Sequence, residues 1–574
     1  MKAYGCKGAA QSCRSRRNIP LIQFKTIDGV LLRDMVMAGT AILEKNREAV
    51  DALNVFPVPD GDTGTNMSLT MQSATRELNS KEFLRADEAA NALAKGALKG
   101  ARGNSGVITS QLLRGFAKAL NGVEKITPVQ FAEALMKGSE MAYKAVMKPK
   151  EGTILTVARV VAEDALKQAR KSPDDYDQLI SVMLKSGEAI LKKTPDMLPA
   201  LKQAGVVDSG GRGLMLIYQG YAAVLRGEDI STADDLMQDD VQTVSDDCHD
   251  LTRDLTYTYC VSFSLTHFRE DCDEHDLDSF RRRLNRIGDA VSVTGDLTRA
   301  EIHVHTDNPG FALDYGIELA EINEIKIDNL AAMKRALEEG EHSDAEHTEP
   351  VSTEPPKKYG FVAVSLGNGF SQFFHDLNVD QIVEGGQTMN PSVDDLMNAI
   401  SQVNAECVFV LPNNGNVIFA ANQAAELSSK DVRVIPTKNV AMGIAAAIAF
   451  QNDIGPDENM ERMNEAAQHV KTAMVTYAIR DSEYNGIEIK QGDIIGLHNG
   501  QIEFSGTSIH DVVLDMMKQI ITDEDELITV YYGADVSEED AKAIAEEIES
   551  QYSDCDVEYH NGGQPLYYYL ISVE

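Results

Sequence analysis

The spacing of apolar residues between positions 27 and 227 constrains the fold more than any other feature of this sequence. Apolar residues recur there three and four positions apart, which places them on one face of a helix. The helical pattern covers residues 89–99, 108–120, 128–147, 154–171, 176–192 and 214–225. Runs with the two-residue period of a strand are almost absent from this region. We therefore predict an all-α helical bundle of about eight helices over residues 24–228.

The pattern changes after residue 228. Residues 229–251 are acidic and poor in apolar side chains, which is typical of a solvated linker. Bulky residues then occupy every second position in 257–265, as in a half-buried strand. A helix over 276–287 and strands over 290–294 and 301–306 are expected to follow. Together these elements predict a small α/β middle domain over residues 252–338.

A second linker separates the middle domain from the C-terminal region. Residues 339–357 are rich in Glu, Pro, Ser and Thr and contain almost no large apolar residue. Beyond it, apolar runs at 361–366, 407–411, 432–436 and 527–532 alternate with helical patterns at 394–403, 415–427, 441–451 and 537–551. This alternation predicts a C-terminal α/β domain over 358–574 with a largely parallel sheet. The whole chain is therefore expected to be a multidomain α plus α/β protein.

Charge and cysteine usage exclude several classes of protein. The 574 residues carry a formal net charge of -37, which would repel nucleic acids and anionic membrane surfaces. No apolar run is long enough for a membrane span. The seven cysteines are scattered without metal-clip spacing and no secretory signal is recognisable, so we expect reduced thiols and a cytoplasmic location. Residues 1–23 are basic in an acidic chain, and we expect a disordered tail or a start-site artefact there.

The stretch from Asn54 to Met67 is the clearest candidate for chemistry. Two prolines keep the backbone extended, and Asp60 and Asp62 then flank a glycine, close enough for both carboxylates to reach one divalent ion. Hard oxygen ligands of this kind suit Mg²⁺ together with substrate phosphates. The small polar residues after Asp62 lead into a helix, whose first backbone N–H groups can bind phosphate. An acidic turn that only caps this helix is the structural alternative.

Two further glycine-rich turns also open helices. In residues 99–111, three glycines let the backbone approach a ligand closely, and Asn104 and Ser105 can donate hydrogen bonds to phosphate. In residues 207–213, Asp208 begins a similar turn. Each turn alone is compatible with an ordinary connection between helices. The three turns together, with paired acids in the first, favour a nucleotide–metal site at one end of the bundle.

These stretches resemble the ATP-binding subunit of the dihydroxyacetone-kinase family, which has a helical DhaL-type domain. Residues 54–67 read Asn-Val-Phe-Pro-Val-Pro-Asp-Gly-Asp-Thr-Gly-Thr-Asn-Met and precede two further domains, which is closer still to the ATP-binding subunit of bacterial fatty acid kinase. The resemblance covers nearly the whole chain from about Lys25 onward. It departs from the dihydroxyacetone-kinase pattern at the first of three metal-binding aspartates, where this chain has Asn54 or is offset by an extra residue.

The resemblance implies roles for individual residues. Asp60 and Asp62 are expected to be catalytic and to bind Mg²⁺, with Asn54 as a further metal ligand through its amide oxygen. ATP is expected to contact Thr63, Gly64, Thr65, Asn66, Asn104, Ser105, Asp208, Ser209 and Gly210. The turn at residues 151–153, Glu-Gly-Thr, resembles another loop of the family's nucleotide site, and a plain helix start at Thr153 explains it equally well.

A second candidate site lies in the middle domain. The period of two places His303 and His305 on one face of the strand 301–306, and Cys260 on the polar face of 257–265. These residue types can bind Zn²⁺ or take part in catalysis, and exposed structural histidines are the alternative from spacing alone. The resemblance raises the functional interpretation, because the middle domain of the fatty acid kinase protein has a matching Cys and His-x-His set.

The resemblance also implies a reaction. We expect a kinase that transfers the ATP γ-phosphoryl group to the carboxylate of a fatty acid, giving an acyl phosphate for phospholipid synthesis. A binding protein of the DegV family would present the fatty acid, and the C-terminal domain is its expected docking site. A nucleotide-binding regulator without turnover and a dihydroxyacetone-type kinase subunit are the alternatives. The sequence leaves open whether the chain is a monomer or a homodimer.

Overall fold

The computed structural model describes residues 24–54, 61–146, 148–227, 257–269, 272, 274–295, 299–329, 355–386, 389–484 and 486–574. The chain forms two compact units, one of residues 1–230 with 355–574 and the other of residues 231–354. The predicted tail 1–23, the linker 229–251 and all but the last three residues of the linker 339–357 lie outside the described residues. Within the described residues, no helix has both the length and the hydropathy needed to cross a membrane.

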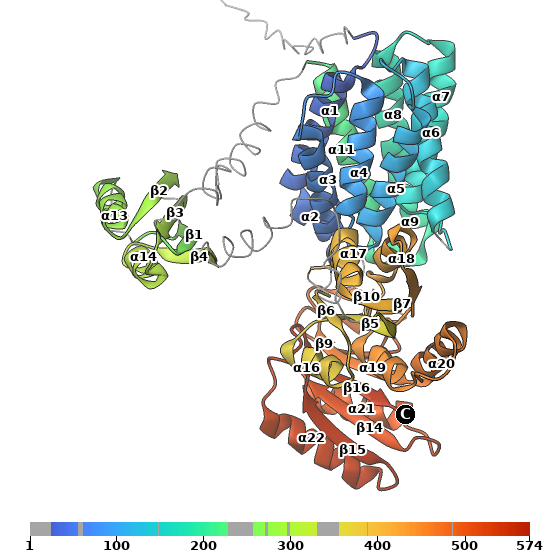
Figure 1. Ribbon diagram of the computed structural model, residues 1–574, viewed down its shortest axis with the longest axis vertical. Coiled ribbons are helices and arrows are strands. Elements are labelled where there is room, and N and C mark those ends of the chain that lie inside the picture. Colours follow the sequence, from blue (N-terminus) through green and yellow to red (C-terminus); the bar gives the residue numbers. More distant parts are fainter. Residues whose placement is uncertain are drawn as a thin grey trace, which may run out of the picture. The chain divides into compact units, whose positions relative to one another are not determined.

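In the described residues up to 227, the first unit has eight helices that are 14 to 18 residues long. They are α1 (Gly29–Lys45), α3 (Thr63–Asn79), α4 (Ala86–Lys99), α5 (Gly103–Ala119), α6 (Pro128–Ala145), α7 (Ile154–Lys171), α8 (Tyr176–Leu191) and α11 (Ser209–Leu225), with the short helices α2 (Arg47–Asp51), α9 (Thr194–Met197) and α10 (Pro199–Ala204). Figure 1 shows the long helices side by side, coloured from blue to green. The described residues of this region form no strand and take part only in two isolated bridges, Ile27 with Ile126 and Arg102 with Ser392, so the predicted all-α domain is confirmed.

Close crossings between these helices depend on small residues. Helices α1 and α11 cross where Gly39 meets Gly220, and a Cβ atom on Gly220 would lie 2.3 Å from the backbone nitrogen of Gly39. A side chain at this position would therefore force the two helices apart. Apolar residues such as Leu32, Met35 and Met215 are almost completely buried in the same core. This core determines how the ends of the helices line up.

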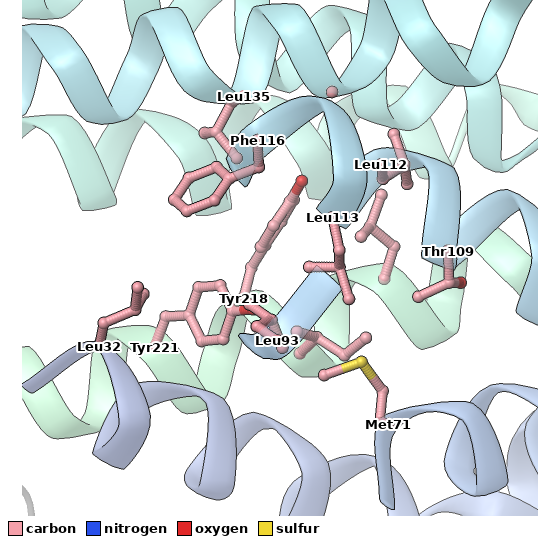
Figure 2. A pocket seen from close by; sticks show the side chains of 13 residues that line it. Leu32, Met71, Leu93, Thr109, Leu112, Leu113, Phe116, Leu135, Tyr218 and Tyr221 are labelled. Carbon is pink, nitrogen blue, oxygen red and sulfur yellow. The ribbon is translucent and has the colours of Figure 1, made fainter. Parts of the chain in front are cut away.

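A small apolar cavity lies inside the bundle (Figure 2). Several leucines, Met71, Phe116 and the rings of Tyr218 and Tyr221 line it, and its volume is about 40 Å³. A cavity needs about 10–15 Å³ of such volume to hold one water molecule, so this one has room for only a few. The cavity is therefore far too small to hold a long acyl chain.

The C-terminal part of the first unit starts with a parallel sheet. Its strand order is β6-β5-β7-β8, with β5 (Lys357–Ser365), β6 (Gln381–Glu384), β7 (Ala405–Leu411) and β8 (Asp431–Val434). The helices α16 (Asn368–Asp376), α17 (Val393–Gln402), α18 (Ile418–Leu427), α19 (Val440–Ile448) and α20 (Pro456–His469) follow these strands in the chain. The predicted alternation of strands and helices is confirmed in this half.

The last part of the chain forms a six-stranded sheet instead, together with helices α21 (Ile509–Ile520) and α22 (Glu538–Gln551) and the short pair β10 (Ser482–Tyr484) and β11 (Ile487–Ile489). The strand order is β13-β12-β9-β16-β14-β15, with β9 (Lys471–Tyr477), β12 (Ile494–His498), β13 (Gln501–Gly506), β14 (Leu527–Tyr532), β15 (Asp556–Asn561) and β16 (Tyr567–Val573). Only β14 and β15 pair in parallel, so the prediction of a largely parallel sheet is wrong here.

A tight hairpin accounts for one of these antiparallel pairings. Between β12 and β13, Asn499 and Gly500 have φ angles of 48° and 80°, as the two central residues of a tight hairpin require. An Asn-Gly pair between two apolar runs is a strong hairpin signal, and it was readable in the sequence.

The described residues of the second unit form an antiparallel sheet of order β2-β3-β1-β4. Its elements are β1 (Tyr259–Thr266), α13 (Glu274–Ile287), β2 (Gly288–Gly295), β3 (Arg299–Thr306), α14 (Pro309–Ile317) and β4 (Glu321–Asn329). In the pairing of β1 with β3, Cys260 faces His305 and Ser262 faces His303. The α/β architecture expected for the middle domain is therefore present.

Candidate nucleotide and metal site

Four long helices of the bundle begin at one open cavity of about 300 Å³. Helices α3, α5, α7 and α11 each place residues of their first turn on its wall. The lining residues are Asn54, Asp62, Thr63, Asn66, Asn104, Ser105, Ile108, Thr153, Ile154, Asp208, Ser209, Gly210 and Asn416. The three turns singled out in the sequence therefore meet in space, and the 151–153 turn joins them.

Helix starts attract anions, because their first N–H groups point outward and the helix dipole is positive there. Helices α3, α5 and α7 have no hydrogen bond from the side chain of their own N-cap residue. Carboxylates from elsewhere bond to the first turns of two of them, Asp51 to α3 and Asp208 to the Ile154 N–H of α7. The described residues that line the cavity include no Lys or Arg. Phosphate charge in this cavity would therefore be neutralised by helix starts and by a metal ion rather than by basic side chains.

Asp62 is the N-cap residue of α3 and is half-buried. Burial raises the pKa of its carboxyl group to about 6, and hydrogen bonds from Asn66 and Asn390 oppose that rise. Asn66 is 3% exposed and lines the same cavity. Asn54 also lines it, whereas Asp60, the other predicted metal ligand, lies outside the described residues.

The start of α3 is held by an acid that sequence reasoning missed. The Asp51 carboxylate accepts hydrogen bonds from the backbone N–H of Gly64 at 2.6 Å and of Thr65 at 3.2 Å, and from the Thr65 hydroxyl at 2.9 Å. Gly64 also packs closely, since a Cβ atom there would lie 2.3 Å from the Arg47 carbonyl oxygen. Gly64 and Thr65 are not among the cavity-lining residues, so the structure places these two predicted phosphate contacts on Asp51 instead. No local signal in the sequence pointed to Asp51, because folding alone brings it to Gly64, 13 positions away.

Weak hydrogen bonds connect the other helix starts to Thr63. The Ser105 hydroxyl lies 3.5 Å from the Thr63 carbonyl oxygen, and the Ser209 hydroxyl lies 3.3 Å from the Thr63 hydroxyl oxygen. Gly103, at the start of α5, has a φ of 54°, which favours glycine. The predicted residues Thr63, Ser105 and Ser209 are therefore neighbours, although 146 residues separate the first from the last.

Asp208 begins α11 and accepts a hydrogen bond from the Gly211 N–H at 2.7 Å. Burial raises the pKa of its carboxyl group to about 6, despite that hydrogen bond. With Asp62, it gives the cavity two carboxyl groups among the described residues.

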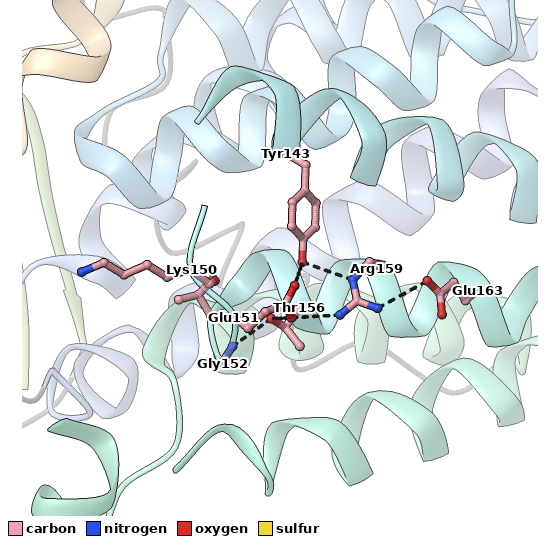
Figure 3. A network of polar contacts seen from close by, with 8 residues as sticks. Tyr143, Lys150, Glu151, Gly152, Thr156, Arg159 and Glu163 are labelled. Atoms are coloured by element: carbon pink, nitrogen blue, oxygen red, sulfur yellow. Dashed lines mark hydrogen bonds and ion pairs between the residues drawn. The ribbon is translucent and has the colours of Figure 1, made fainter. Parts of the chain in front are cut away.

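A polar network fixes the 151–153 turn (Figure 3). Glu151 accepts hydrogen bonds from Tyr143 at 2.9 Å, from Thr156 at 2.7 Å and from Arg159 at 2.8 Å. Gly152 has a φ of 86° and donates its N–H to the Thr156 hydroxyl at 2.9 Å. Thr153 is the N-cap residue of α7 and also lines the cavity. Its position is therefore compatible with a plain helix start and with a loop of a nucleotide site.

The donor set fits Mg²⁺ and a nucleotide. Carboxylate and amide oxygens from Asp62, Asn54 and Asn66 are hard ligands of the kind that Mg²⁺ takes beside substrate phosphates. Hydroxyl and amide donors from Thr63, Ser105, Asn104 and Ser209 face the same space, which suits phosphate oxygens. Sequence reasoning did not assign Ile108, Ile154 or Asn416 to this wall, and Asn416 comes from a strand-end loop in the C-terminal part of the chain.

The second unit brings together the three residues predicted there. Ligand atoms of Cys260, His303 and His305 all lie within 4.8 Å of one another. His303 Nδ1 is 3.8 Å from the Cys260 sulfur and 3.1 Å from the Ser262 hydroxyl oxygen, and His305 Nδ1 is 3.5 Å from Asp289. Cys260 is buried and the histidines are half-buried, so the exposed structural alternative does not describe them. Three ligands are one fewer than a structural Zn²⁺ site uses, and zinc stays a prediction.

Family models match three parts of the chain. They are the DAK2 domain over residues 57–223, the middle domain of FakA-like fatty acid kinase proteins over 256–337, and the C-terminal domain of the same FakA-like proteins over 360–574. Among solved structures, the dihydroxyacetone kinase of C. freundii covers 39% of this chain and 38% of its own, at 18% identity and a TM-score of 0.27. A fatty-acid-binding DegV family protein from Thermus thermophilus covers 38% of this chain and 99% of its own, at 11% identity and a TM-score of 0.30. Likenesses this weak establish neither a shared fold nor a shared function.

Similarity to whole proteins is much stronger. Protein YloV of Bacillus subtilis is 40% identical over 559 residues, which are 96% of this chain and 100% of the relative. An uncharacterized protein of Staphylococcus saprophyticus is 39% identical over 96% of this chain and 99% of its own length. With all three domain models matched in order, this chain belongs to the family of FakA-like fatty acid kinase proteins that begin with a DAK2 domain.

Proposed function

We propose that this chain is the ATP-binding subunit of a kinase that phosphorylates the carboxylate of a fatty acid. The observation that supports this most directly is the cavity at which four helix starts meet with the Asp62 and Asp208 carboxyl groups. Membership of the FakA-like fatty acid kinase family supports the choice of acceptor. The product would be an acyl phosphate.

The reaction requires no proton transfer by the protein. A carboxylate with a pKa of about 4–5 is ionised at neutral pH, so it can attack the γ-phosphorus without a general base. One carboxylate oxygen forms the new P–O bond, and the bond from the γ-phosphorus to the β,γ-bridging oxygen breaks, which releases ADP. Positioning and charge neutralisation then supply most of the acceleration.

The residues around the cavity suit these two tasks. Asp62, Asn54 and Asn66 would hold Mg²⁺, which would offset the charge of the phosphates. Thr63, Asn104, Ser105 and Ser209 would orient the phosphate oxygens at the helix starts. Asp60 is proposed as a second acidic ligand on its sequence position alone.

A second protein would have to carry the acyl chain. In the part of the chain that the structure describes, the apolar cavity of the bundle holds about 40 Å³, and the nucleotide cavity is lined mainly by polar residues. Burying a long acyl chain is worth about 0.8 kcal/mol for each methylene, so a carrier would keep it in its own pocket. We propose a DegV-family fatty-acid-binding protein as that carrier, docked by the C-terminal domain.

The test uses the full-length chain with ATP, Mg²⁺ and a DegV-family protein loaded with a long-chain fatty acid. Acyl phosphate is trapped with hydroxylamine and quantified. Asp62→Asn is expected to lower turnover at least about 100-fold, because it removes the charge of a metal ligand. Asp174→Asn, on an exposed turn, is the matched control. Wild-type turnover in Asp62→Asn would overturn the site, and equal rates with free fatty acid and no carrier would overturn the carrier.

A further inference from the structure

The C-terminal part of the first unit reaches into the nucleotide loops. Asn390, which precedes α17, donates a hydrogen bond from its side-chain amide to Oδ2 of Asp62, and a second, at 3.5 Å, to Oδ1 of Asn66. Asn390 is 1% exposed, and its own Oδ1 atom is buried without a hydrogen-bond partner. An amide from residue 390 therefore sits directly on the acid proposed to bind Mg²⁺.

Other contacts hold this segment at the start of α5. Arg102 donates a hydrogen bond to the Asn390 carbonyl oxygen at 2.8 Å and lies 3.4 Å from the Asp395 carboxylate. The Val393 N–H donates to the Ala101 carbonyl oxygen at 3.1 Å. The Arg102 and Val393 hydrogen bonds thus hold the segment that carries Asn390 against the start of α5. The Val393 hydrogen bond joins the backbone of the C-terminal domain to that of the helical bundle.

The surrounding contact is buried and specific. Ala101 and Val107 are fully buried in the same apolar cluster as strands β5 and β7. Next to them, Gln111 donates to Gln423 at 2.7 Å, and these side chains are 2% and 5% exposed. Arg480 also donates to the carbonyl oxygens of Ala52 and Asn54, and Asn54 lines the cavity.

We propose that Asn390 occupies the metal position on Asp62, so that docking of the C-terminal domain and binding of Mg²⁺ at Asp62 exclude each other. This inference rests on the proposed function of the cavity. The N–H groups of the amide carry partial positive charge and bond to the same oxygens that a cation would use, Asp62 Oδ2 and Asn66 Oδ1. A metal ion at these oxygens displaces the amide, since both cannot fill one site.

Because the two events exclude each other, binding of Mg²⁺ with nucleotide and docking of the C-terminal domain on the bundle are thermodynamically coupled. If Mg²⁺ with nucleotide binds better to the undocked form, it shifts the population toward that form, and docking in turn weakens metal binding by the same factor. The C-terminal domain is released from the bundle when the nucleotide site is loaded. Release also opens the mouth of the cavity, where Asn104 donates to Asn416 at 3.1 Å in the docked form.

Hydrogen exchange of the Val393 amide in the full-length chain measures docking directly. With Mg²⁺ and a non-hydrolysable ATP analogue, we expect this amide to exchange at least about 10-fold faster than with Mg²⁺ alone. The same comparison for amides inside α6 serves as a reference that docking does not touch. Unchanged or slower exchange of Val393 on loading would overturn the proposal.

Calorimetry of the same ligand tests the role of the side chain. Asn390→Ala is expected to bind the Mg²⁺–analogue complex about five-fold more tightly, and Gln423→Ala, which weakens docking away from the metal, is expected to act in the same direction. Asn398→Ala, on the exposed side of α17, is the matched control and should leave affinity unchanged. Weaker binding by Asn390→Ala would overturn the proposal and would make Asn390 a metal ligand. No binding by the wild-type chain would contradict the proposed function itself, whereas a reversed sign contradicts only the present inference.

Discussion

The nucleotide cavity and the cysteine–histidine cluster are built in different ways. The cavity joins four helix starts, and Thr63 and Ser209 meet there across 146 residues of chain. The cluster lies on two paired strands of one sheet, where the register alone sets Cys260 opposite His305. The first site therefore depends on the packing of a whole bundle, and the second depends on one strand pair. A site of the first kind should be lost with distant core changes, whereas a site of the second kind should tolerate them.

The largest expected effect comes from the helix crossing far from the cavity. Gly220→Val would place side-chain atoms against the backbone of Gly39 and should lower the free energy of unfolding of the first unit by about 3 kcal/mol or more. Nucleotide binding should fall with it, while the reactivity of Cys260 toward a thiol reagent should stay at the wild-type level. Calorimetric unfolding measures the stability of the first unit, and thiol titration measures the reactivity of Cys260. A parallel loss of both sites would contradict the contrast drawn between them.

Substitutions in the cysteine–histidine cluster should leave the nucleotide cavity intact. We expect Cys260→Ala and His303→Ala each to lower acyl phosphate formation at least about 10-fold while leaving the affinity for Mg²⁺–nucleotide unchanged. His267→Ala, an exposed histidine of the same unit, is the control. Steady-state assays with calorimetry separate the two readouts, and elemental analysis of the purified chain tests for bound zinc. Normal kinetics in both variants would leave the cluster without a role in the reaction.

Asp208 offers a test in which stability and activity move in opposite directions. Because its folded-state pKa is raised to about 6, ionisation costs stability as pH rises from about 4 to 6, and the cost is fully present above that window. Asp208→Asn keeps an acceptor for Gly211 and removes that cost, so it should raise the free energy of unfolding at pH 7 by about 2 kcal/mol. Below about pH 4 the variant and the wild type should converge. Denaturant unfolding at several pH values measures this, and turnover should fall if the carboxylate serves the nucleotide.

The smallest effect is expected at Asp51. Asp51→Ala removes the acceptor for the first N–H groups of α3 and should cost about 1–2 kcal/mol, the usual range for loss of a helix cap. Nucleotide affinity should decline modestly, because Gly64 and Thr65 position Asp62 and Asn66. Asp51→Asn should recover part of the stability. An unchanged midpoint in urea for Asp51→Ala would show that this cap does not support the site.

The helical bundle and most of the polar residues at its helix starts could be predicted from local sequence. The residues that could not be predicted depend on how distant segments pack. Helical spacing identifies the bundle, and the small polar residues at helix starts identify Thr63, Asn104, Ser105 and Ser209, because both signals act over a few residues. Gly64 and Thr65 carried the same signal but contact Asp51, since only the packing of α2 against α3 decides which N–H groups stay free.

Long-range partners had no such signal. Asn390 and Asn416 lie in strand-to-helix connections, and nothing within these segments indicates that they reach the helix starts of the bundle. Their positions at the cavity follow from the buried contact around Ala101 and Gln111, which joins residues more than three hundred positions apart. The pairing of β12 with β13 is a different case, because its Asn499-Gly500 turn is a local hairpin signal.

The absence of Lys and Arg among the described residues of the cavity wall bears on how fast a nucleotide arrives. With a net charge of -37, the protein repels the complex of ATP with Mg²⁺, which is itself an anion, and no local basic patch on that wall reverses the repulsion. Salt shortens the range of this field. Association should therefore speed up as ionic strength rises, the reverse of the behaviour of sites steered by basic residues, and stopped-flow measurement of the association rate in increasing KCl would reveal it.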